Sequence, residues 1–190
     1  MLRQMSLLAA FLNLSGQPAV VAGGGRVALR RTQTLLEAGL QVTVVAPQVH
    51  PEFSVLPVTV VQRSCEPADL KDAQVVVAAT NDPAVNDRLC AAAHQQGALV
   101  NHAGDAALST LRFPAVISSG DLQVAVSTGR ELPMLAQALG ERISALLPDS
   151  TTVEQWSRQR EEALRETGPG RELALQTLRK DIRTTMGVPA

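Results

Sequence analysis

Three consecutive glycines, Gly23 to Gly25, stand between a run of small apolar residues and a helical pattern. Gly23, Gly25 and Ala28 match the spacing G-x-G-x-x-G/A. In this pattern the first glycine permits a tight turn, the second lets the backbone approach a pyrophosphate, and the small third residue lets the helix pack close to the strand. The N–H groups and the positive end of the helix dipole then face the anion. The stretch predicts a dinucleotide phosphate site; the alternative is a glycine turn that binds nothing.

The residues that usually accompany such a turn are only partly present. NAD-binding domains of this type carry an acidic residue at the end of the second strand, where it binds the ribose 2′-OH. That position falls here at Ala46–Pro47, and neither an acid nor an arginine stands there. Thr80 and Asn81 end a later apolar run. We expect them on the same side of the crevice as the glycines, because ligands bind at that edge of open α/β sheets.

Alternating strand and helix patterns must position these residues. Strands are predicted over 19–23, 41–47, 58–63, 72–80 and 98–103. Helices are predicted over 26–39, ending at Gly39, and from Pro83 to Gly97, with Asn81 or Asp82 as the N-cap. Strands of nearly continuous valine and alanine, separated by helices, indicate a parallel sheet in a Rossmann-type, doubly wound α/β domain.

The pattern changes after residue 111. Residues 112–128 predict a β-hairpin with its turn at Ser119–Gly120–Asp121, and 131–148 predict an amphipathic helix that stops at Pro148. The polar remainder is helical in pattern and is split at 167–170. We therefore expect an NAD-binding domain over 1–111, a small α+β dimerisation region over 112–148 and a helical C-terminal region over 149–190.

Composition narrows the function classes. The 190 residues have a net charge of −1 and only 2% aromatic residues, which argues against a nucleic-acid partner. No apolar run has the length of a membrane span. We interpret the first 16 residues as part of the fold rather than a signal peptide, because Asn13 interrupts their apolar run. Cys65 and Cys90 are expected to be free thiols in a cytoplasmic protein.

Several segments, in this order, resemble one known family. They are FLNLSGQPAVVAGGGRVALRRTQTLLEAGLQVTVVAP, VVVAATNDPAVN, VNHAGD, FPAVI and VAVSTGRELPMLAQALGERISALLP, from Phe11 to Pro148. The chain is similar to the precorrin-2 dehydrogenase and sirohydrochlorin ferrochelatase family, which includes the N-terminal module of sirohaem synthase. The resemblance implies NAD-dependent oxidation of precorrin-2 to sirohydrochlorin by a homodimer. In some members the same site also inserts Fe²⁺, a lyase reaction that gives sirohaem.

The resemblance also implies which residues hold the cofactor. The NAD phosphates would lie against the glycine turn and the two residues after it, while the loop after the second strand would line the adenosine end. Many members have Ala-Pro in that loop, so the missing acid is expected. Thr80 and Asn81 would flank the nicotinamide half. The implied NAD-binding residues are Gly23, Gly24, Gly25, Arg26, Val27, Ala46, Pro47, Gln48, Thr80 and Asn81.

Two residues are candidates for proton transfer. In the family an aspartate follows the strand asparagine by three positions; here that position is Gly104, and the carboxylate comes one residue later, at Asp105. Asp105 is the first candidate, and the alternative is a loop aspartate that only forms a turn or cap. His102, near the end of the fifth predicted strand, is the second candidate because its ordinary pKa suits proton transfer. A structural histidine is the alternative there.

The implied substrate is a tetrapyrrole with many carboxylates, which requires donors and positive charge. Arginine binds carboxylates through two parallel hydrogen bonds. The candidate substrate-binding residues flank the predicted hairpin: Arg112, Thr128, Gly129 and Arg130. Solvent-facing arginines are the alternative. The family usually has Gly-Gly and Ser-Pro in the second loop, of which this chain keeps Gly129 and Pro133.

No cluster of histidine, cysteine or acidic residues has metal-ligand spacing, so no bound metal is expected, although Fe²⁺ remains a candidate substrate. Two alternatives to the dehydrogenase stay open. One is a regulatory Rossmann module that senses nucleotides, and the other is a chelatase or tetrapyrrole-binding protein without redox activity. Sensor modules usually keep the acid after the second strand and lack the FPAVI hairpin, which counts against the first.

Overall fold

The computed structural model describes residues 7–129 and 132–189. The chain forms two compact units, one from Leu8 to Phe113 and the other from Pro114 onward. The division into 1–111, 112–148 and 149–190 remains a proposal within this arrangement. Each unit has its own secondary structure and is described separately below.

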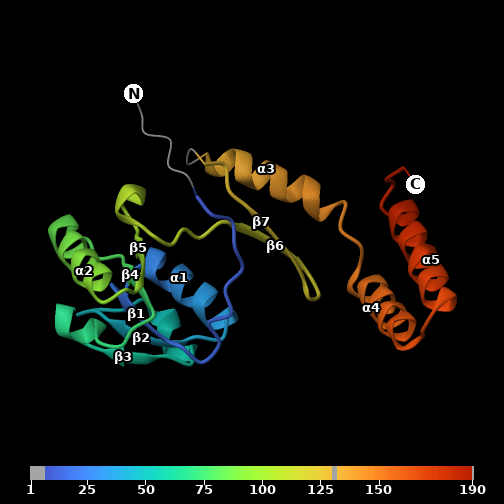
Figure 1. Cartoon of the computed structure of the whole chain (residues 1–190). Helices are drawn as coiled ribbons and strands as arrows, with labels where there is room; N and C mark the ends of the chain where they lie inside the picture. Colours follow the sequence, from blue (N-terminus) through green and yellow to red (C-terminus); the bar gives the residue numbers. More distant parts are fainter. Residues whose placement is uncertain (1–6, 130–131, 190) are drawn as a thin grey trace. The chain divides into compact units, whose positions relative to one another are not determined.

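The first unit is built on a five-stranded parallel sheet (Figure 1). In spatial order its strands are β3 (Thr59–Val61), β2 (Gln41–Val45), β1 (Pro18–Ala22), β4 (Val75–Ala78) and β5 (Leu99–His102). The order reverses at β1, which pairs with both β2 and β4. This reversal creates the crevice at which open α/β sheets bind ligands. The predicted Rossmann-type fold is confirmed.

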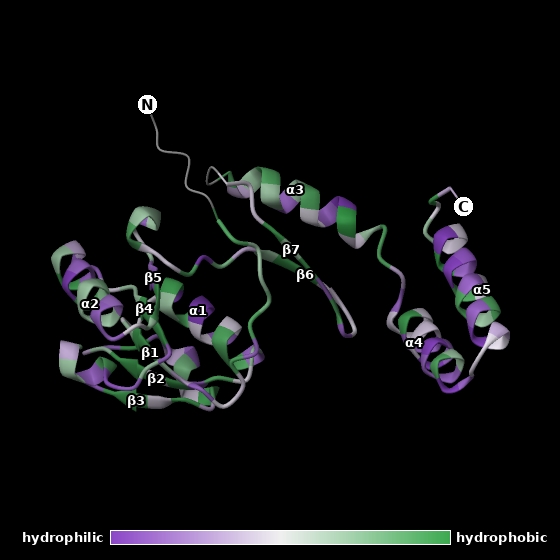
Figure 2. Ribbon diagram, viewed as in Figure 1, coloured by the Kyte–Doolittle hydropathy of each residue, from purple (hydrophilic) through white to green (hydrophobic). Residues whose placement is uncertain are grey.

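Helices cover both faces of the sheet, so its strands are buried on both sides. Helix α1 (Arg26–Glu37) and the 3₁₀ helix η1 (Pro51–Val55) pack in one core cluster, in which Phe53 is 1% exposed. Helix α2 (Pro83–Gln95) and the 3₁₀ helix η2 (Pro67–Leu70) pack in the other. Successive β1 residues alternate between the two clusters, as a strand's two-residue period requires. The sheet is accordingly the most uniformly apolar part of Figure 2.

Local signals explain where these elements begin and end. Asp82 is the N-cap of α2, and its side chain accepts hydrogen bonds from the N–H groups of Ala84 and Val85. Gly39 follows α1 at φ 79°, a left-handed conformation that glycine adopts without strain. The prediction that β4 begins at residue 72 is wrong, because Asp72 has φ 63° and forms a turn. The strand starts only at Val75.

The second unit contains much less buried surface. Strands β6 (Ala115–Ser119) and β7 (Leu122–Val126) form the predicted antiparallel hairpin, and α3 (Pro133–Ser144) packs on it. The prediction that this helix continues to Pro148 is wrong. It ends at Ser144: the Leu146 N–H donates to the Ile143 carbonyl oxygen, an i→i−3 bond that tightens the last turn, and Leu147 precedes Pro148, which disfavours helical geometry there.

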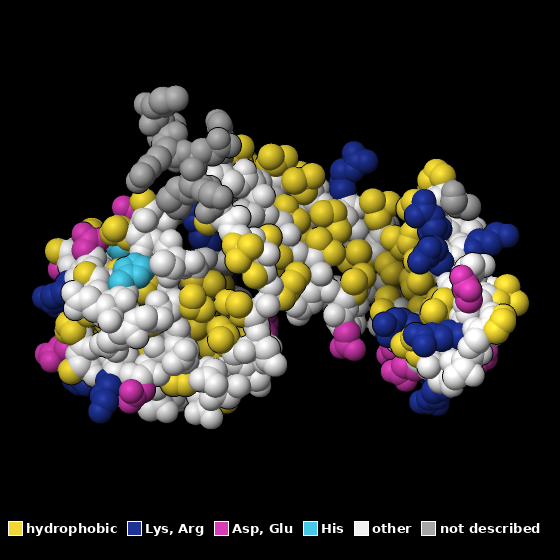
Figure 3. All heavy atoms as spheres, in the orientation of Figure 1, with side chains coloured by type: hydrophobic (Ala, Val, Ile, Leu, Met, Phe, Trp, Pro, Cys, Tyr) yellow, Lys and Arg dark blue, Asp and Glu magenta, His cyan; other side chains and the backbone are white. Residues whose placement is uncertain are grey.

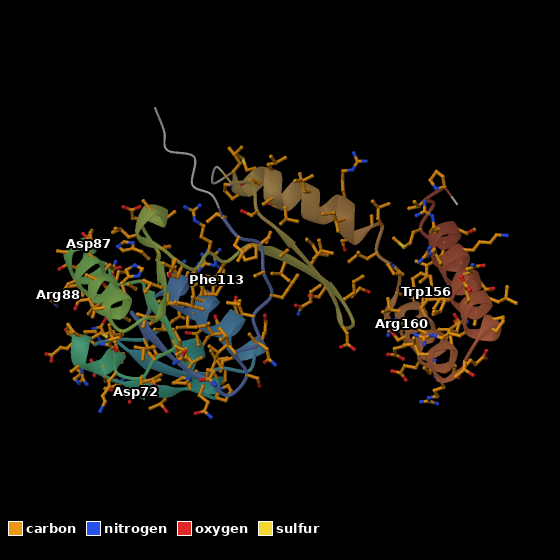
Figure 4. The ribbon with its side chains drawn as sticks, in the orientation of Figure 1. Asp72, Asp87, Arg88, Phe113, Trp156 and Arg160 are labelled. Atoms are coloured by element: carbon orange, nitrogen blue, oxygen red, sulfur yellow. The ribbon has the colours of Figure 1, made fainter. Side chains whose placement is uncertain are left out.

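The C-terminal helices α4 (Ser150–Arg165) and α5 (Pro169–Thr185) pack against each other. Ala163 and Leu178 are their buried apolar residues. The indole of Trp156, labelled in Figure 4, donates a hydrogen bond of 2.8 Å to Asp181. None of the helices formed by the described residues is long and apolar enough to cross a bilayer.

Candidate active site

The candidate site lies at one edge of the parallel sheet. Because β1, β2, β4 and β5 run in the same direction, the loops that follow them meet at their carboxyl ends. These loops contain the glycine turn, Ala46–Gln48, Thr80–Asn81 and the segment 103–105. Eight of the ten predicted NAD-binding residues, together with Asp105, therefore belong to four loops at one edge of one unit, and Arg26 and Val27 begin α1 directly after the glycine turn.

The glycine turn packs so tightly that two of its positions exclude any side chain. A Cβ atom on Gly23, which has φ 120°, would lie 2.3 Å from the Ala79 carbonyl oxygen. A Cβ on Gly24 would lie 2.0 Å from the Gln48 carbonyl oxygen. Gly23 and Gly24 thus hold the loops after β1, β2 and β4 together. The three-residue spacing alone did not reveal this role for Gly24.

Gly25 differs from its two neighbours. A Cβ atom there would meet nothing within 4 Å, so the space over this position is open. Gly25 is also the N-cap of α1, no side chain caps the helix, and no acidic residue stands in its first turn. Exposed Arg26 and Val27 follow it. An open approach to uncapped N–H groups fits the pyrophosphate of a dinucleotide, which these groups and the helix dipole would bind.

The loop after β2 is attached to the glycine turn. The N–H of His50 donates a hydrogen bond of 2.7 Å to the Gly24 carbonyl oxygen. Ala46 is buried, whereas Pro47 and Gln48 are exposed beside the turn. Related domains carry an acidic residue at this place, whereas this loop presents backbone and the apolar ring of Pro47. The loop therefore fits the adenosine end of the ligand, but it cannot provide the carboxylate contact to the ribose.

Asn86 holds the loop after β4 in place. Its Oδ1 accepts hydrogen bonds from the Thr80 N–H (3.0 Å) and the Thr80 hydroxyl (2.7 Å), and its Nδ2 donates to the Thr80 carbonyl oxygen (3.1 Å). Asn86 is only 5% exposed. Asn81 is exposed beside this clamp. Sequence analysis missed Asn86, although a polar residue one turn into α2, on the same side as Leu89 and Cys90, was the available signal.

Both candidates for proton transfer lie at the end of β5 or in the loop that follows it, and their surroundings differ. Asp105 is exposed and is the N-cap of the short 3₁₀ helix η3 (Ala106–Leu108). Its Oδ1 accepts a hydrogen bond of 2.7 Å from the Ala107 N–H. His102 is the last residue of β5 and is only 6% exposed. Both ring nitrogens have partners: the N–H groups of Gly104 and Asp105, and the Asp87 carboxylate.

The predicted substrate-binding residues fall in both units. Arg112 belongs to the first unit, where its Nη2 donates a hydrogen bond of 3.2 Å to the Ala106 carbonyl oxygen beside Asp105. Thr128 and Gly129 belong to the second unit. The Thr128 hydroxyl accepts a hydrogen bond from the Leu132 N–H, and Gly129 has φ 67°. Arg130 lies outside the described residues.

The two cysteines are free and buried, as predicted. Burial raises the pKa of Cys65 to about 12 and that of Cys90 to about 11. Both therefore remain protonated thiols at neutral pH and do not act as nucleophiles. Within residues 7–129 and 132–189, no group of three or more histidine, cysteine or acidic side chains is placed to hold a metal ion.

Comparisons with known proteins agree with this geometry. The family model described as "Putative NAD(P)-binding" matches residues 10–115. Siroheme synthase 2 of Aeromonas salmonicida is 40% identical over 146 residues, which is 76% of this chain and 30% of that protein. The siroheme synthase of Tolumonas auensis is also 40% identical over 146 residues, or 31% of its length. The chain thus spans less than a third of the length of these curated relatives.

A solved structure extends the similarity beyond the first unit. SirC, a precorrin-2 dehydrogenase, has a TM-score of 0.72 and 27% sequence identity, and the match covers 94% of this chain and 98% of that one. The fold and the glycine turn define an NAD(P)-binding protein of the Rossmann type. The chain belongs to the family of the precorrin-2 dehydrogenases and the siroheme synthases. The predicted family and the predicted nicotinamide cofactor are both confirmed.

Proposed function

We propose that this chain oxidises precorrin-2 to sirohydrochlorin with NAD⁺, a step in sirohaem synthesis. The observation that carries the proposal is the carboxyl edge of the sheet, where a dinucleotide cradle and an exposed aspartate share four adjoining loops. The similarity to a precorrin-2 dehydrogenase over 94% of the chain supports the substrate. NAD rather than another nucleotide is supported by the same similarity.

In this proposal the residues of the chain have distinct roles. NAD⁺, when bound, supplies the hydride acceptor. The N–H groups around Gly25 bind the pyrophosphate, and the clamped Thr80 borders the nicotinamide half. Asp105 accepts the proton that the macrocycle loses, because its side chain is exposed and the Ala107 N–H occupies only one of its two carboxylate oxygens. Arg112, Thr128, Gly129 and Arg130 bind the substrate carboxylates.

The variant Asp105→Asn tests this assignment. We expect kcat for NADH formation in an anaerobic assay with precorrin-2 to fall about 10²-fold or more, because the base is removed. The affinity for NAD⁺ should not change, since the hydrogen bonds of Asp105 among the described residues go to His102, Ala107 and Ser109 and not to the glycine turn. Asp72→Asn is the matched control: it removes the same charge from an exposed turn at the amino end of β4, and asparagine also tolerates φ 63°.

The outcomes separate the open alternatives. Full activity of Asp105→Asn would show that another group is the base. A wild-type protein that binds sirohydrochlorin but never reduces NAD⁺ would contradict the dehydrogenase and favour a tetrapyrrole-binding protein or chelatase. Fe²⁺ insertion is tested in the same vessel, by adding Fe²⁺ after the oxidation and following the sirohaem spectrum.

We also propose that the protein is a homodimer. No residue of β6, β7 or α3 is fully buried among the described residues, so the hairpin and its helix leave apolar surface uncovered, as interaction surfaces do. Figure 3 shows apolar side chains gathered over α3 and the hairpin. Val116, Met134, Leu135 and Leu139 are 52%, 78%, 46% and 39% exposed. A second copy of this face would cover them.

Light scattering after size-exclusion chromatography measures the mass directly. Twice the mass of one chain is the expected result, and replacement of Met134 and Leu139 by lysine should give single chains. A monomeric wild-type protein would contradict the dimer. We place the protein in the cytoplasm, because its two cysteines lie unpaired in one core cluster, as is usual in a reducing compartment.

A further inference from the structure

The His102 ring is held at both of its nitrogens. The N–H groups of Gly104 and Asp105 donate hydrogen bonds of 3.1 and 2.8 Å to Nδ1. Nε2 lies 3.1 Å from Oδ1 of Asp87, which extends from α2 (labelled in Figure 4). The His102 side chain is 4% exposed, whereas that of Asp87 is 59% exposed. The ring is therefore an internal bridge between α2 and the loop after β5.

These contacts determine which ring nitrogen of His102 carries the proton. A nitrogen that accepts two N–H groups must offer its lone pair, so Nδ1 carries no proton. In the neutral imidazole the proton then resides on Nε2 and is donated to Asp87, which selects this tautomer. A proton on Nδ1 would leave both loop N–H groups without an acceptor. The bridge therefore uses Nδ1 as an acceptor and Nε2 as a donor.

The same contacts orient Asp105. Its N–H donates to His102, its carbonyl oxygen accepts a 3.3 Å hydrogen bond from the Ser109 hydroxyl, and its Oδ1 accepts from Ala107. The Ser109 hydroxyl also accepts from the backbone N–H of His102 at 2.9 Å. Among the described residues the other carboxylate oxygen, Oδ2, has no hydrogen-bond partner. The loop thus holds the backbone of Asp105 firmly and leaves one oxygen open.

We propose that His102 is a positioning residue that fixes the Asp105 loop through Nδ1, and that Asp87 serves the reaction by holding the imidazole in its Nε2–H tautomer. The catalytic part of this inference rests on the proposed function, in which Asp105 is the base. His102 then moves no proton itself. Asp87, an exposed residue on a neighbouring helix, acquires a role that its position in the sequence does not suggest.

Two substitutions at His102 test the roles of its two ring nitrogens separately. In His102→Asn the side-chain oxygen takes the place of Nδ1 and can accept from the loop N–H groups. In His102→Gln the side-chain nitrogen takes the place of Nε2, so the bond to Asp87 is kept and the loop acceptor is lost. We expect His102→Gln to lower kcat about 10²-fold, as misplacement of a catalytic group by about 1 Å does, with the KM for NAD⁺ unchanged. His102→Asn should restore most of this loss.

Two spectroscopic readouts do not depend on activity. Hydrogen exchange of the Gly104 and Asp105 amides should accelerate in His102→Gln and stay near wild type in His102→Asn. Nitrogen-15 chemical shifts of the ring should show the Nε2–H tautomer in the wild type and a larger share of the Nδ1–H tautomer in Asp87→Ala, which offers Nε2–H no acceptor and whose kcat should fall less than that of His102→Gln. Asp87→Ala changes an exposed side chain, so it tests the proposal even where a buried His102 variant fails to fold. Asp72→Asn is the control for charge.

Three results would overturn the inference: an Nδ1–H tautomer in the wild type, unchanged amide exchange in His102→Gln, or a His102→Asn variant as inactive as His102→Gln. A failure of the proposed function gives a different pattern. In that case the wild type does not oxidise precorrin-2, while the tautomer and the exchange rates still report whether His102 holds the loop.

Discussion

The two units of this chain differ in how many of their apolar residues they bury. Among the described residues, every buried apolar side chain except Ala163 and Leu178 lies between Ala19 and Val100. The second unit instead exposes large apolar residues on β6 and α3. A sheet covered on both faces completes its own core, whereas the hairpin β6–β7 with α3 contains no fully buried residue among those described. The first unit is thus a self-contained platform for the ligand loops, and the second presents an apolar surface.

The chain carries a natural probe for this difference. Trp156 is its single tryptophan and there is no tyrosine, so the tryptophan fluorescence reports on α4 and α5 alone. Far-ultraviolet circular dichroism and NAD⁺ binding report on the sheet as well. Together the two probes distinguish unfolding of the first unit from unfolding of α4 and α5.

The largest effect is expected from Phe53→Ala. Phe53 is 1% exposed in the core between η1, α1 and the sheet, so its removal should cost about 3–5 kcal/mol of the free energy of unfolding. Urea titration should show an earlier dichroism transition and loss of NAD⁺ binding, with the Trp156 transition unmoved. Val55→Ala, at an 82% exposed position of the same 3₁₀ helix, is the control and should change neither transition appreciably. Transitions that shift together would show that the two units unfold as one.

A smaller effect should distinguish two adjacent glycines. Gly24→Ala forces a Cβ against the Gln48 carbonyl oxygen, which the backbone can relieve only by moving, at a cost of about 1–3 kcal/mol. Gly25→Ala meets no atom within 4 Å and should keep full stability, yet bind NAD⁺ more weakly because its methyl occupies the approach to the phosphates. Calorimetry and NAD⁺ titration of both variants test this. Equal NAD⁺ affinity of wild type and Gly25→Ala would show that the phosphates do not bind at this turn.

The smallest effect is expected on the stability of the first unit at low pH. The paired hydrogen bonds from Arg63 lower the pKa of Asp69 to about 2 from the ordinary 3.8. Because the folded pKa is depressed, this contribution is complete above 3.8 and is lost as the pH falls towards 2. Arg63→Gln should remove it and shift acid unfolding of the sheet slightly upward in pH. The fluorescence of Trp156 should not follow, and an identical acid transition in both proteins would contradict the role of the pair.

Much of the first unit followed from periodicity and local signals. The strand positions came from the valine runs, and the helix ends came from Asp82, Gly39 and Gly97, because caps act within a few residues of the chain. The predicted ends of strands and helices were less accurate where the backbone conformation, rather than the residue type, ends the element. Asp72 begins a turn although its residue type is compatible with a strand end, and α3 stops before its amphipathic pattern does.

The candidate site was predictable where one loop sufficed and not where several meet. The spacing of Gly23 and Gly25 indicated a phosphate turn, but the need for Gly24 depends on where the loop after β2 passes. Asn86 and Asp87 were missed because their partners, Thr80 and His102, are six and fifteen residues away in sequence. No local pattern encodes such a pairing.

By itself, the sequence determined the order of strands and helices, the position of the glycine turn and the family, because these depend on short-range propensity and on residue types in a fixed order. The tertiary structure decided which loops share the carboxyl edge and that Gly24 must lack a side chain. It also decided that His102 uses Nδ1 to hold the loop of Asp105 and Nε2 to contact Asp87. The physical reason is that a hydrogen bond or a steric contact between distant residues exists only after the sheet has brought their loops together.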